Sequence, residues 1–265
     1  MLYDDYTFLK FQKRPHGVLL ITIDRGEKLN AANDRMHLEF AEVWLTVKHD
    51  RDVRVAVITG AGRAFSAGGD LNEDVKKLGQ IEPIVEMGEM ALRIVYNMIH
   101  LDKPVISAIN GPAAGAGLAV ALSADISIIA EEARVTDAHA NIGVAAGDHA
   151  VMMWPLFCGM PKAKLYLLTA DLIDGREAER IGLVSMCVPL SDLLPTALAL
   201  AERIALKPQR AIRWTKRCLN HWLRQAAPIF DLSVAYEGLN FMEPDAKEGL
   251  TAFLEKRPPS FPSLG

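Results

Sequence analysis

Two short turns rich in glycine and alanine carry the first chemical signal in the sequence. Residues 64–71 (AFSAGGDL) and residues 111–118 (GPAAGAGL) each follow a β-rich run and lead into the start of a helical pattern. A helix start leaves backbone N–H groups unpaired at the positive end of the helix dipole. If the turns converge, the N–H groups of Ala67 and Ala116 can hold one carbonyl oxygen as it becomes an oxyanion or enolate.

Other interpretations of these turns are less favoured. Either turn alone is typical of tight strand–helix packing, but the presence of both favours a binding site. Neither turn completes the GxGxxG dinucleotide fingerprint, and the sequence contains no GxxxxGK[ST] phosphate loop. Ser66 lacks the first glycine of a nucleophile elbow, so a structural role is predicted for it.

The elements that must position these turns belong to an α/β chain. The β-rich runs recur between helical patterns such as residues 84–98, and they occupy residues 18–24, 55–60, 105–110, 126–130 and 183–188. The C-terminal part is predicted to be helical, at residues 193–206, 209–223 and 230–241. We therefore expect a core over residues 1–190 that holds the site. A helical region over residues 191–265, rich in aromatic side chains, predicts self-association.

Composition and charge limit the function classes. With 50% hydrophobic and 23% charged residues, the 265-residue chain is typical of a globular protein. Its 29 basic and 33 acidic residues give a net charge of −4, which offers no general attraction to nucleic acid or anionic membranes. The longest apolar stretch, residues 113–130, is interrupted by polar residues, so no membrane span is predicted. Three separated cysteines and an acidic N-terminus predict a cytoplasmic protein without a disulfide framework or zinc site.

Four blocks of sequence give the chain a family resemblance. They are residues 27–31 (EKLNA), 64–71 (AFSAGGDL), 103–111 (KPVISAING) and 248–257 (EGLTAFLEKR). On these blocks the chain resembles the crotonase superfamily of enoyl-CoA hydratases and isomerases over nearly its whole length. The resemblance implies an α/β fold with a spiral core of repeated ββα turns, and a C-terminal helical region that assembles trimers, often paired as hexamers. It also implies an acyl-CoA substrate, with coenzyme A as part of the thioester and with no prosthetic group or metal.

The resemblance also assigns binding residues. In this family the thioester oxygen lies between two backbone N–H groups, which map here onto Ala67 and Ala116. Coenzyme A recognition maps onto residues around the first turn and onto two residues from the C-terminal helix of a neighbouring subunit. The expected set is Lys28, Leu29, Ala64, Ala67, Asp70 and Leu71, with Phe253 and Lys256 from the neighbour. For either lysine alone, a solvated surface charge is the simpler interpretation.

The sequence departs from the hydratases at the catalytic carboxylates. Family hydratases use two glutamates around a water molecule, but here Ala119 and His139 occupy those positions. A segment rich in glycine and alanine leads from His139 to Asp148 and permits a return toward the same pocket. A carboxylate bonded to one imidazole nitrogen fixes the tautomer and raises the basicity of the ring. We therefore expect His139 to act as general base or acid, with Asp148 as its orienting residue.

Several polar residues near this pair remain open. A core histidine satisfied by backbone groups is the alternative for His139. His149 is a weaker candidate, and Glu237 is a possible further acid although a solvated helix face is its simpler interpretation. The spacing of Asp137, His139, Asp148 and His149 matches no standard set of metal ligands, so no metal site is predicted.

Three functions are compatible with the sequence. The first is an acyl-CoA enzyme of the hydratase or isomerase type that stabilises a thioester enolate and moves protons through His139 and Asp148. The second is a carbon–carbon bond hydrolase or a decarboxylase. The missing glutamates favour this second function. So does the His…Gly-Asp pattern followed by Trp154-Pro155. It resembles the branch of the superfamily that includes oxocamphor hydrolase, an enzyme that cleaves a diketone. The third is a scaffold that binds acyl-CoA without catalysis.

Overall fold

The computed structural model describes residues 1–264 and contains a main sheet of six strands. The strand order is β1-β2-β3-β4-β6-β9, with β1 antiparallel to β2 and the other neighbours parallel. Inner strands such as β3 and β4 are almost continuously apolar because both of their faces are covered. The strands are β1 (Leu9–Arg14), β2 (Val18–Ile23), β3 (Val55–Gly60), β4 (Val105–Ile109), β6 (Ile126–Ala130) and β9 (Met186–Val188).

A small second sheet brings the chemically important segments together. It consists of β5 (Ala113–Ala114), β7 (Arg134–Thr136) and β8 (Ile173–Asp174), in the order β5-β7-β8. β5 lies within the second small-residue turn, and a bridge between Ser66 and Ala113 joins it to the first turn. On its other side β5 pairs with β7, which leads directly to His139. This sheet therefore places both turns beside the histidine.

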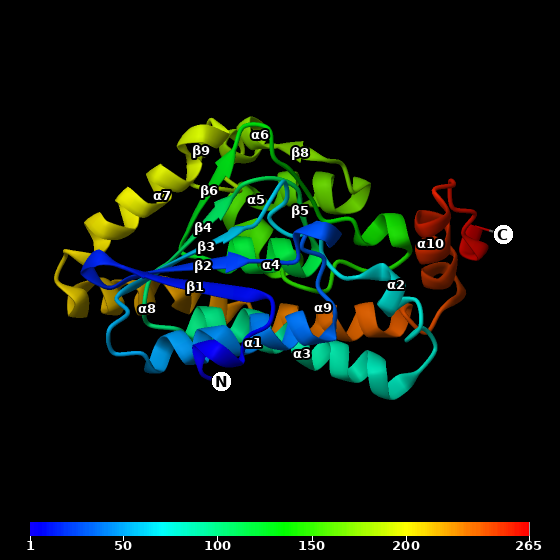
Figure 1. Ribbon diagram of the computed structural model, residues 1–265. Helices are drawn as coiled ribbons and strands as arrows, with labels where there is room; N and C mark the ends of the chain where they lie inside the picture. Colours follow the sequence, from blue (N-terminus) through cyan, green and yellow to red (C-terminus); the bar gives the residue numbers. More distant parts are fainter. Residues whose placement is uncertain (265) are drawn as a thin grey trace.

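Helices cover the sheets (Figure 1). α7 (Leu190–Ala205) packs against β2, β3, β4 and β6. α3 (Ile81–His100) contacts α1 (Asp34–His49), α4 (Gly115–Ser123), α8 (Gln209–Gln225) and α9 (Ala227–Asn240). α10, drawn in red in Figure 1, lies at the end of the molecule beside α2. The remaining helices are α2 (Leu71–Asp74), α5 (Ala150–Thr169), α6 (Gly175–Arg180) and α10 (Pro244–Glu255).

The predicted α/β class and its main elements are confirmed, with one difference at the expected domain boundary. The hydrophobic core continues across residue 190, because one face of α7 is buried in the same cluster as the main sheet. Small alanine side chains at four-residue spacing let this helix lie close to the strands. The buried residues of α7 are Leu193, Ala197, Ala201 and Ala205, and Phe230 of α9 belongs to the same core.

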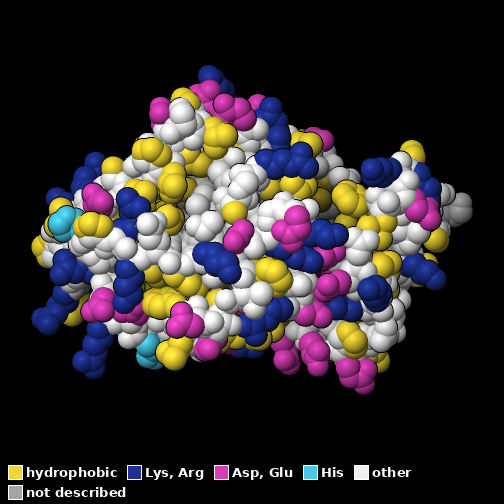
Figure 2. All heavy atoms as spheres, in the orientation of Figure 1, with side chains coloured by type: hydrophobic (Ala, Val, Ile, Leu, Met, Phe, Trp, Pro, Cys, Tyr) yellow, Lys and Arg dark blue, Asp and Glu magenta, His cyan; other side chains and the backbone are white. Residues whose placement is uncertain are grey.

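The surface gives two further findings about partners. No helix within residues 1–264 combines the length and the apolar character that a membrane crossing requires. On the face shown in Figure 2, acidic and basic side chains are interspersed. This face therefore offers no continuous basic surface of the kind that binds a phosphate backbone.

Candidate active site

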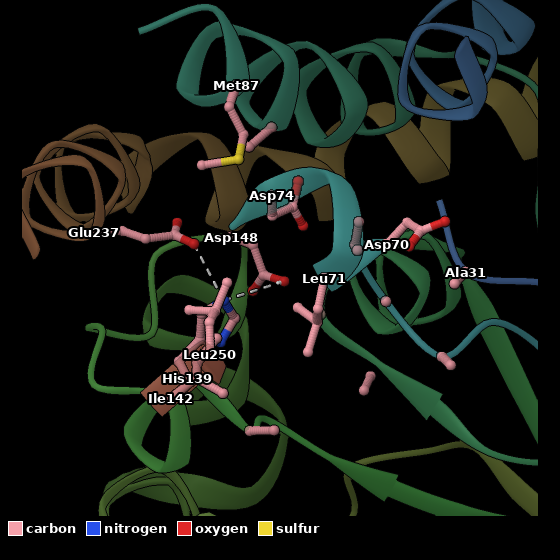
Figure 3. A pocket seen from close by; sticks show the side chains of 18 of the residues that line it. Ala31, Asp70, Leu71, Asp74, Met87, His139, Ile142, Asp148, Glu237 and Leu250 are labelled. Atoms are coloured by element: carbon pink, nitrogen blue, oxygen red, sulfur yellow. Dashed lines mark ion pairs between the residues drawn. The ribbon is translucent and has the colours of Figure 1, made fainter. Parts of the chain in front are cut away.

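A cavity of about 510 Å³ lies where the two small-residue turns meet. Most of its wall is apolar, and the polar groups concentrate around His139 and around α2 (Figure 3). This combination of apolar walls with a few convergent polar groups is typical of a small-molecule site. The apolar lining comes mainly from α3, α9 and α10, through Ile84, Met87, Ala91, Ile94, Val234, Leu250 and Leu254.

The two turns converge as the sequence predicts. Ala114 N–H donates to the carbonyl oxygen of Ser66 at 3.1 Å, which ties the second turn to the first. The contact needs glycine, since a Cβ on Gly117 would lie 2.4 Å from the Cβ of Ser66. The Ser66 hydroxyl donates to the carbonyl oxygen of Asn30 at 2.7 Å and is fully buried. Ser66 therefore holds the turns together and does not face the cavity as a nucleophile.

The first turn offers a different amide from the one expected. Ala67 N–H already donates to the carbonyl oxygen of Leu29 at 3.0 Å, so it is not free to bind a substrate oxygen. Asp70 N–H similarly donates to the carbonyl oxygen of Ala32 at 2.9 Å. Between them, the N–H groups of Gly68 and Gly69 have no acceptor among residues 1–264, and Gly69 N lies 4.0 Å from where a Cβ on Gly115 of the second turn would be. Because the turn pairs with residues 29–32, Gly69 replaces Ala67 as the candidate donor.

In the second turn, the amide of Ala116 remains the candidate donor. Ala116 is the second residue of α4, and the N–H groups of a first helical turn have no partner within the helix. No side chain caps this helix. Gly68 and Gly69 lie against Gly115, since a Cβ on Gly115 would lie 3.6 Å from Gly68 Cα and 4.0 Å from Gly69 N. The amides of Gly69 and Ala116 therefore border the same part of the cavity.

His139 lies in a cluster of three carboxylates beside these turns (Figure 3). Its Nδ1 is 2.8 Å from Asp137 Oδ1, and its Nε2 is 3.2 Å from Glu237 Oε1. Asp148 Oδ2 is 4.0 Å from the same Nε2, too far for a hydrogen bond. The structure thus differs from the expected pairing, because Asp137 and not Asp148 holds Nδ1. Glu237 faces the histidine in the cavity and is not on a solvated helix face.

A second histidine explains why Asp148 does not hold His139. Asp148 Oδ1 lies 2.6 Å from Nδ1 of the fully buried His149. The indole N–H of Trp154 donates to Nε2 of His149 at 3.3 Å. Because an indole N–H can only donate, Nε2 of His149 must accept and its proton lies on Nδ1, where it is donated to Asp148. Trp154 and His149 therefore fix Asp148, and both nitrogens of His149 are occupied by hydrogen bonds.

The charges in this cluster favour a shared proton. Burial acts to lower the pKa of His139, but the carboxylates of Asp137 and Asp148 outweigh it and raise that pKa well above the usual value. Burial raises the pKa of Glu237, although its hydrogen bond to His139 opposes the change. Burial also acts to raise the pKa of Asp148, but His149 and His139 lower it to about 2. One mobile proton is consequently held between Nε2 of His139 and Glu237, beside an ionised Asp148.

The residues expected to bind coenzyme A divide into two groups. Those that line the cavity are Lys28, Leu29, Ala67, Asp70, Leu71 and Phe253, whereas Ala64 and Lys256 do not. The carbonyl oxygen of Ala64 instead accepts a hydrogen bond from Asn30 Nδ2 at 2.9 Å. The Asp70 carboxylate is held by Arg25 at 2.9 Å in a largely buried ion pair. Phe253 lines the cavity of its own chain, where the sequence had assigned it to a neighbouring subunit.

Comparisons with known proteins agree with this fold. The family model described as "Enoyl-CoA hydratase/isomerase" matches residues 13–263. A 1,2-epoxyphenylacetyl-CoA isomerase of Escherichia coli is 34% identical over 251 residues, covering 92% of this chain and 95% of the relative. A crotonyl-CoA hydratase of Syntrophomonas wolfei is 34% identical over 266 residues, covering 98% of this chain and 99% of the relative. The chain therefore belongs to the enoyl-CoA hydratase/isomerase family of the crotonase superfamily.

A solved structure supports the same assignment. The crystal structure of an enoyl-CoA hydratase/isomerase from Mycobacterium paratuberculosis superimposes with a TM-score of 0.88 at 33% identity. The match covers 93% of this chain and 99% of that chain. That solved structure thus shares the fold over nearly its whole length. The two sequence relatives are named for different reactions, an isomerisation and a hydration.

Proposed function

We propose that this protein is an acyl-CoA-processing enzyme that works through a thioester enolate. The observation that carries the proposal is the 3.2 Å contact of His139 Nε2 with Glu237 Oε1 in a cavity that the amides of Gly69 and Ala116 also border. Two backbone N–H groups aimed at one oxygen stabilise the negative charge that enolate formation places there. A histidine and a carboxylate sharing a proton can remove and return a hydrogen at the adjacent carbon.

In this mechanism the thioester oxygen lies between the amides of Gly69 and Ala116. Glu237, in its ionised form, takes the proton from the α carbon, and the electron pair of the broken C–H bond becomes the enolate. Protonated His139, held at Nδ1 by Asp137, stabilises the charge and relays the proton. In an isomerisation the proton returns to a different carbon as the double bond moves. In a hydration the water oxygen bonds to the β carbon while Glu237 takes a proton from the water, and the electron pair of the double bond becomes the enolate. The α carbon then takes a proton from the Glu237–His139 pair. None of these steps requires a prosthetic group.

The nucleotide part of the substrate is proposed to lie at the mouth of the cavity. Lys28 and Phe253 are both exposed residues of its lining, from the segment before α1 and from α10. A lysine can pair with a phosphate and an aromatic ring can cover an adenine or pantetheine group. Lys256 lies outside the cavity lining, so a role for it requires contact from a neighbouring chain.

Exchange of the α hydrogen is the most direct test of this function. Wild-type protein is incubated with butyryl-CoA in D₂O, and crotonyl-CoA hydration is followed in parallel. We expect His139→Ala and Glu237→Gln each to lower the exchange rate by on the order of 10²-fold or more, as loss of a proton-transfer group does. The matched controls His49→Ala and Glu243→Gln replace exposed residues and should retain full activity. Exchange that survives both active-site changes would refute the assignment.

Carbon–carbon bond hydrolysis is the second candidate. Ala119 lines the cavity where hydratases of the family carry a glutamate. Asp148 adds a third carboxylate near His139, and this carboxylate and the histidine can position a water molecule as a nucleophile. The Trp154-Pro155 pattern of the diketone-cleaving branch favours the same chemistry. Cleavage of a β-diketone panel by the wild type, without exchange in butyryl-CoA, would support it. Decarboxylation is less favoured, because the carboxyl groups of Asp148 and Glu237 in the cavity would repel a carboxylate on the substrate.

A purely binding function is the remaining alternative. A binding scaffold has no use for three carboxylates and two histidines in a largely buried cluster, because burying charged groups costs free energy of folding. Its distinguishing result is binding of acyl-CoA that is unaffected by His139→Ala, with no turnover of any thioester or diketone.

We infer that the protein self-associates through α8 and α9, as a trimer or a dimer of trimers. α8 buries only Lys216 and Asn220 within the chain, while its Trp214 and Trp222 are more than 60% exposed. Exposed aromatic residues in this number mark an interaction surface. Native mass spectrometry should give a mass of three or six chains, and Trp222→Glu should reduce it.

We also propose a cytoplasmic location, because the three free cysteines fit a reducing compartment.

A further inference from the structure

Asp74 is a buried carboxyl of the cavity that the mechanism above does not use. It is the last residue of α2, is 9% exposed, and lines the cavity together with His139 and Glu237. Figure 3 shows it near α3, on a different side of the cavity from His139. A buried carboxyl that faces a site and not solvent requires an explanation.

One oxygen of Asp74 lies directly against the proposed oxyanion site. A Cβ on Gly69 would lie 2.4 Å from Asp74 Oδ2, so this oxygen is in contact with the Gly69 backbone. Oδ2 forms no hydrogen bond with residues 1–264. The other oxygen, Oδ1, is 3.4 Å from Lys77 Nζ, and Lys77 is shared with Asp34. The carboxyl therefore has one oxygen held by Lys77 and one oxygen against the backbone of Gly69, the candidate oxyanion donor.

A charged carboxylate at this position would oppose catalysis. The negative charge that develops on the thioester oxygen would be repelled by an ionised Asp74, whereas a neutral carboxylic acid would donate a hydrogen bond to it. The proposal below rests on the proposed function, because it requires that the oxygen binds beside Gly69.

The groups around Asp74 favour its neutral form. Burial raises the pKa of Asp74 to about 6, and the charges of Asp34 and Asp70 act in the same direction. Lys77 opposes this change. His37 of α1 adds no positive charge at neutral pH, because burial lowers its pKa to about 4. On the side of α10, the residues that line the cavity are the apolar Leu250, Phe253 and Leu254.

We propose that Asp74, as a neutral carboxylic acid, is a third hydrogen-bond donor to the substrate oxygen. It supplements the amides of Gly69 and Ala116 with an O–H group that is present only while Asp74 is protonated. The hydrogen bond strengthens as negative charge builds on the oxygen, so the contribution is larger in the transition state than in the ground state. Asp74 thereby makes the oxyanion site sensitive to pH.

The test compares Asp74→Asn and Asp74→Leu with the wild type from pH 5 to pH 8. The rate of α-hydrogen exchange into butyryl-CoA and the affinity for acetoacetyl-CoA, a ready enolate former, are both measured. The asparagine amide donates at every pH, so the rate ratio of Asp74→Asn to wild type should rise by about tenfold per pH unit above pH 6. Asp74→Leu should lower the rate at pH 5 by on the order of 10²-fold, as loss of one oxyanion donor does. Glu73→Gln, a neighbour on α2 outside the cavity lining, is the matched control.

The possible results separate this proposal from the proposed function. A constant ratio of Asp74→Asn to wild type across the pH range, or a rate for folded Asp74→Leu within twofold of wild type, would overturn the role of Asp74. If acetoacetyl-CoA affinity shows the expected pH-dependent ratio but no thioester exchanges hydrogen, the donor role stands and the enzymatic proposal fails. If the wild type neither binds nor exchanges these thioesters, both proposals fail.

Discussion

Replacing Asp137 by asparagine gives the sharpest test of how His139 is held. Asp137 is 1% exposed, and its Oδ1 lies 2.8 Å from Nδ1 of His139. The carboxylate can only accept a hydrogen bond, so it fixes the proton of the imidazole on Nδ1 and leaves Nε2 toward Glu237. Asparagine removes this charge and can donate to Nδ1 instead, which would reverse the tautomer.

The size of the effect follows from two contributions. Loss of a charged hydrogen bond to His139 costs about 1.5–3 kcal/mol, which corresponds to roughly 10- to 150-fold in rate. A reversed tautomer raises the loss toward about 10⁴-fold, as it does when the carboxylate of a Ser-His-Asp triad is replaced by its amide. The pKa of His139 should also fall, because burial lowers it and Asp137 is the first of the charges that raise it. We therefore expect an exchange rate reduced by at least about 10-fold, together with a lower pKa.

The assay is α-hydrogen exchange into butyryl-CoA between pH 5.5 and pH 9, with the His139 pKa followed by NMR of the ring proton. Asp171→Asn replaces an exposed aspartate and serves as the control, and circular dichroism verifies the fold of both variants. An exchange rate within threefold of wild type, with an unchanged titration of His139, would refute the role given to Asp137.

Three further predictions concern the surroundings of the site. Gly69→Ala should lower the exchange rate by up to about 10²-fold while the protein remains folded, because the new Cβ would lie 2.4 Å from Asp74 Oδ2 and displace that carboxyl. Gly26→Ala, whose new Cβ would have its nearest neighbour at 3.7 Å, should leave the exchange rate unchanged. Folding raises the pKa of Asp74 from 3.8 to about 6, so the wild type should lose about 2 to 3 kcal/mol of unfolding free energy as the pH rises from below 4 through 6. Asp74→Asn should remove this pH dependence, which urea unfolding measures. Trp154→Phe should cost about 1–2 kcal/mol in the same assay, because Nε2 of the buried His149 loses its donor, and an unchanged unfolding midpoint would contradict that hydrogen bond.

Much of the fold was predictable because hydrophobic period and turn chemistry are local. Strands at residues 55–60 and 126–130 are found at the predicted positions, and the helical pattern of residues 84–98 lies within α3. The packing of α7 was harder to predict from the sequence. Its alanine-rich face packs on strands far away in the sequence, and the sequence pattern does not show which strands these are.

The site was predictable in its parts but not in its pairings. Convergence of the two turns followed from their shared pattern, but the choice of Gly69 over Ala67 depends on hydrogen bonds with residues 29–32, a pairing between distant segments. Asp137 was visible two residues before His139, but nothing in the sequence showed which carboxylate contacts Nδ1 of His139. Glu237 lies 98 positions from His139, and only the packing of α9 across the cavity brings it to 3.2 Å.

A crystal structure with bound acetoacetyl-CoA would test the central claim most directly. We predict that the thioester oxygen lies about 2.7–3.1 Å from the backbone nitrogens of both Gly69 and Ala116, with the α carbon facing Glu237 and His139. A thioester oxygen bound away from these amides, or an α carbon on the opposite side from His139, would contradict the mechanism.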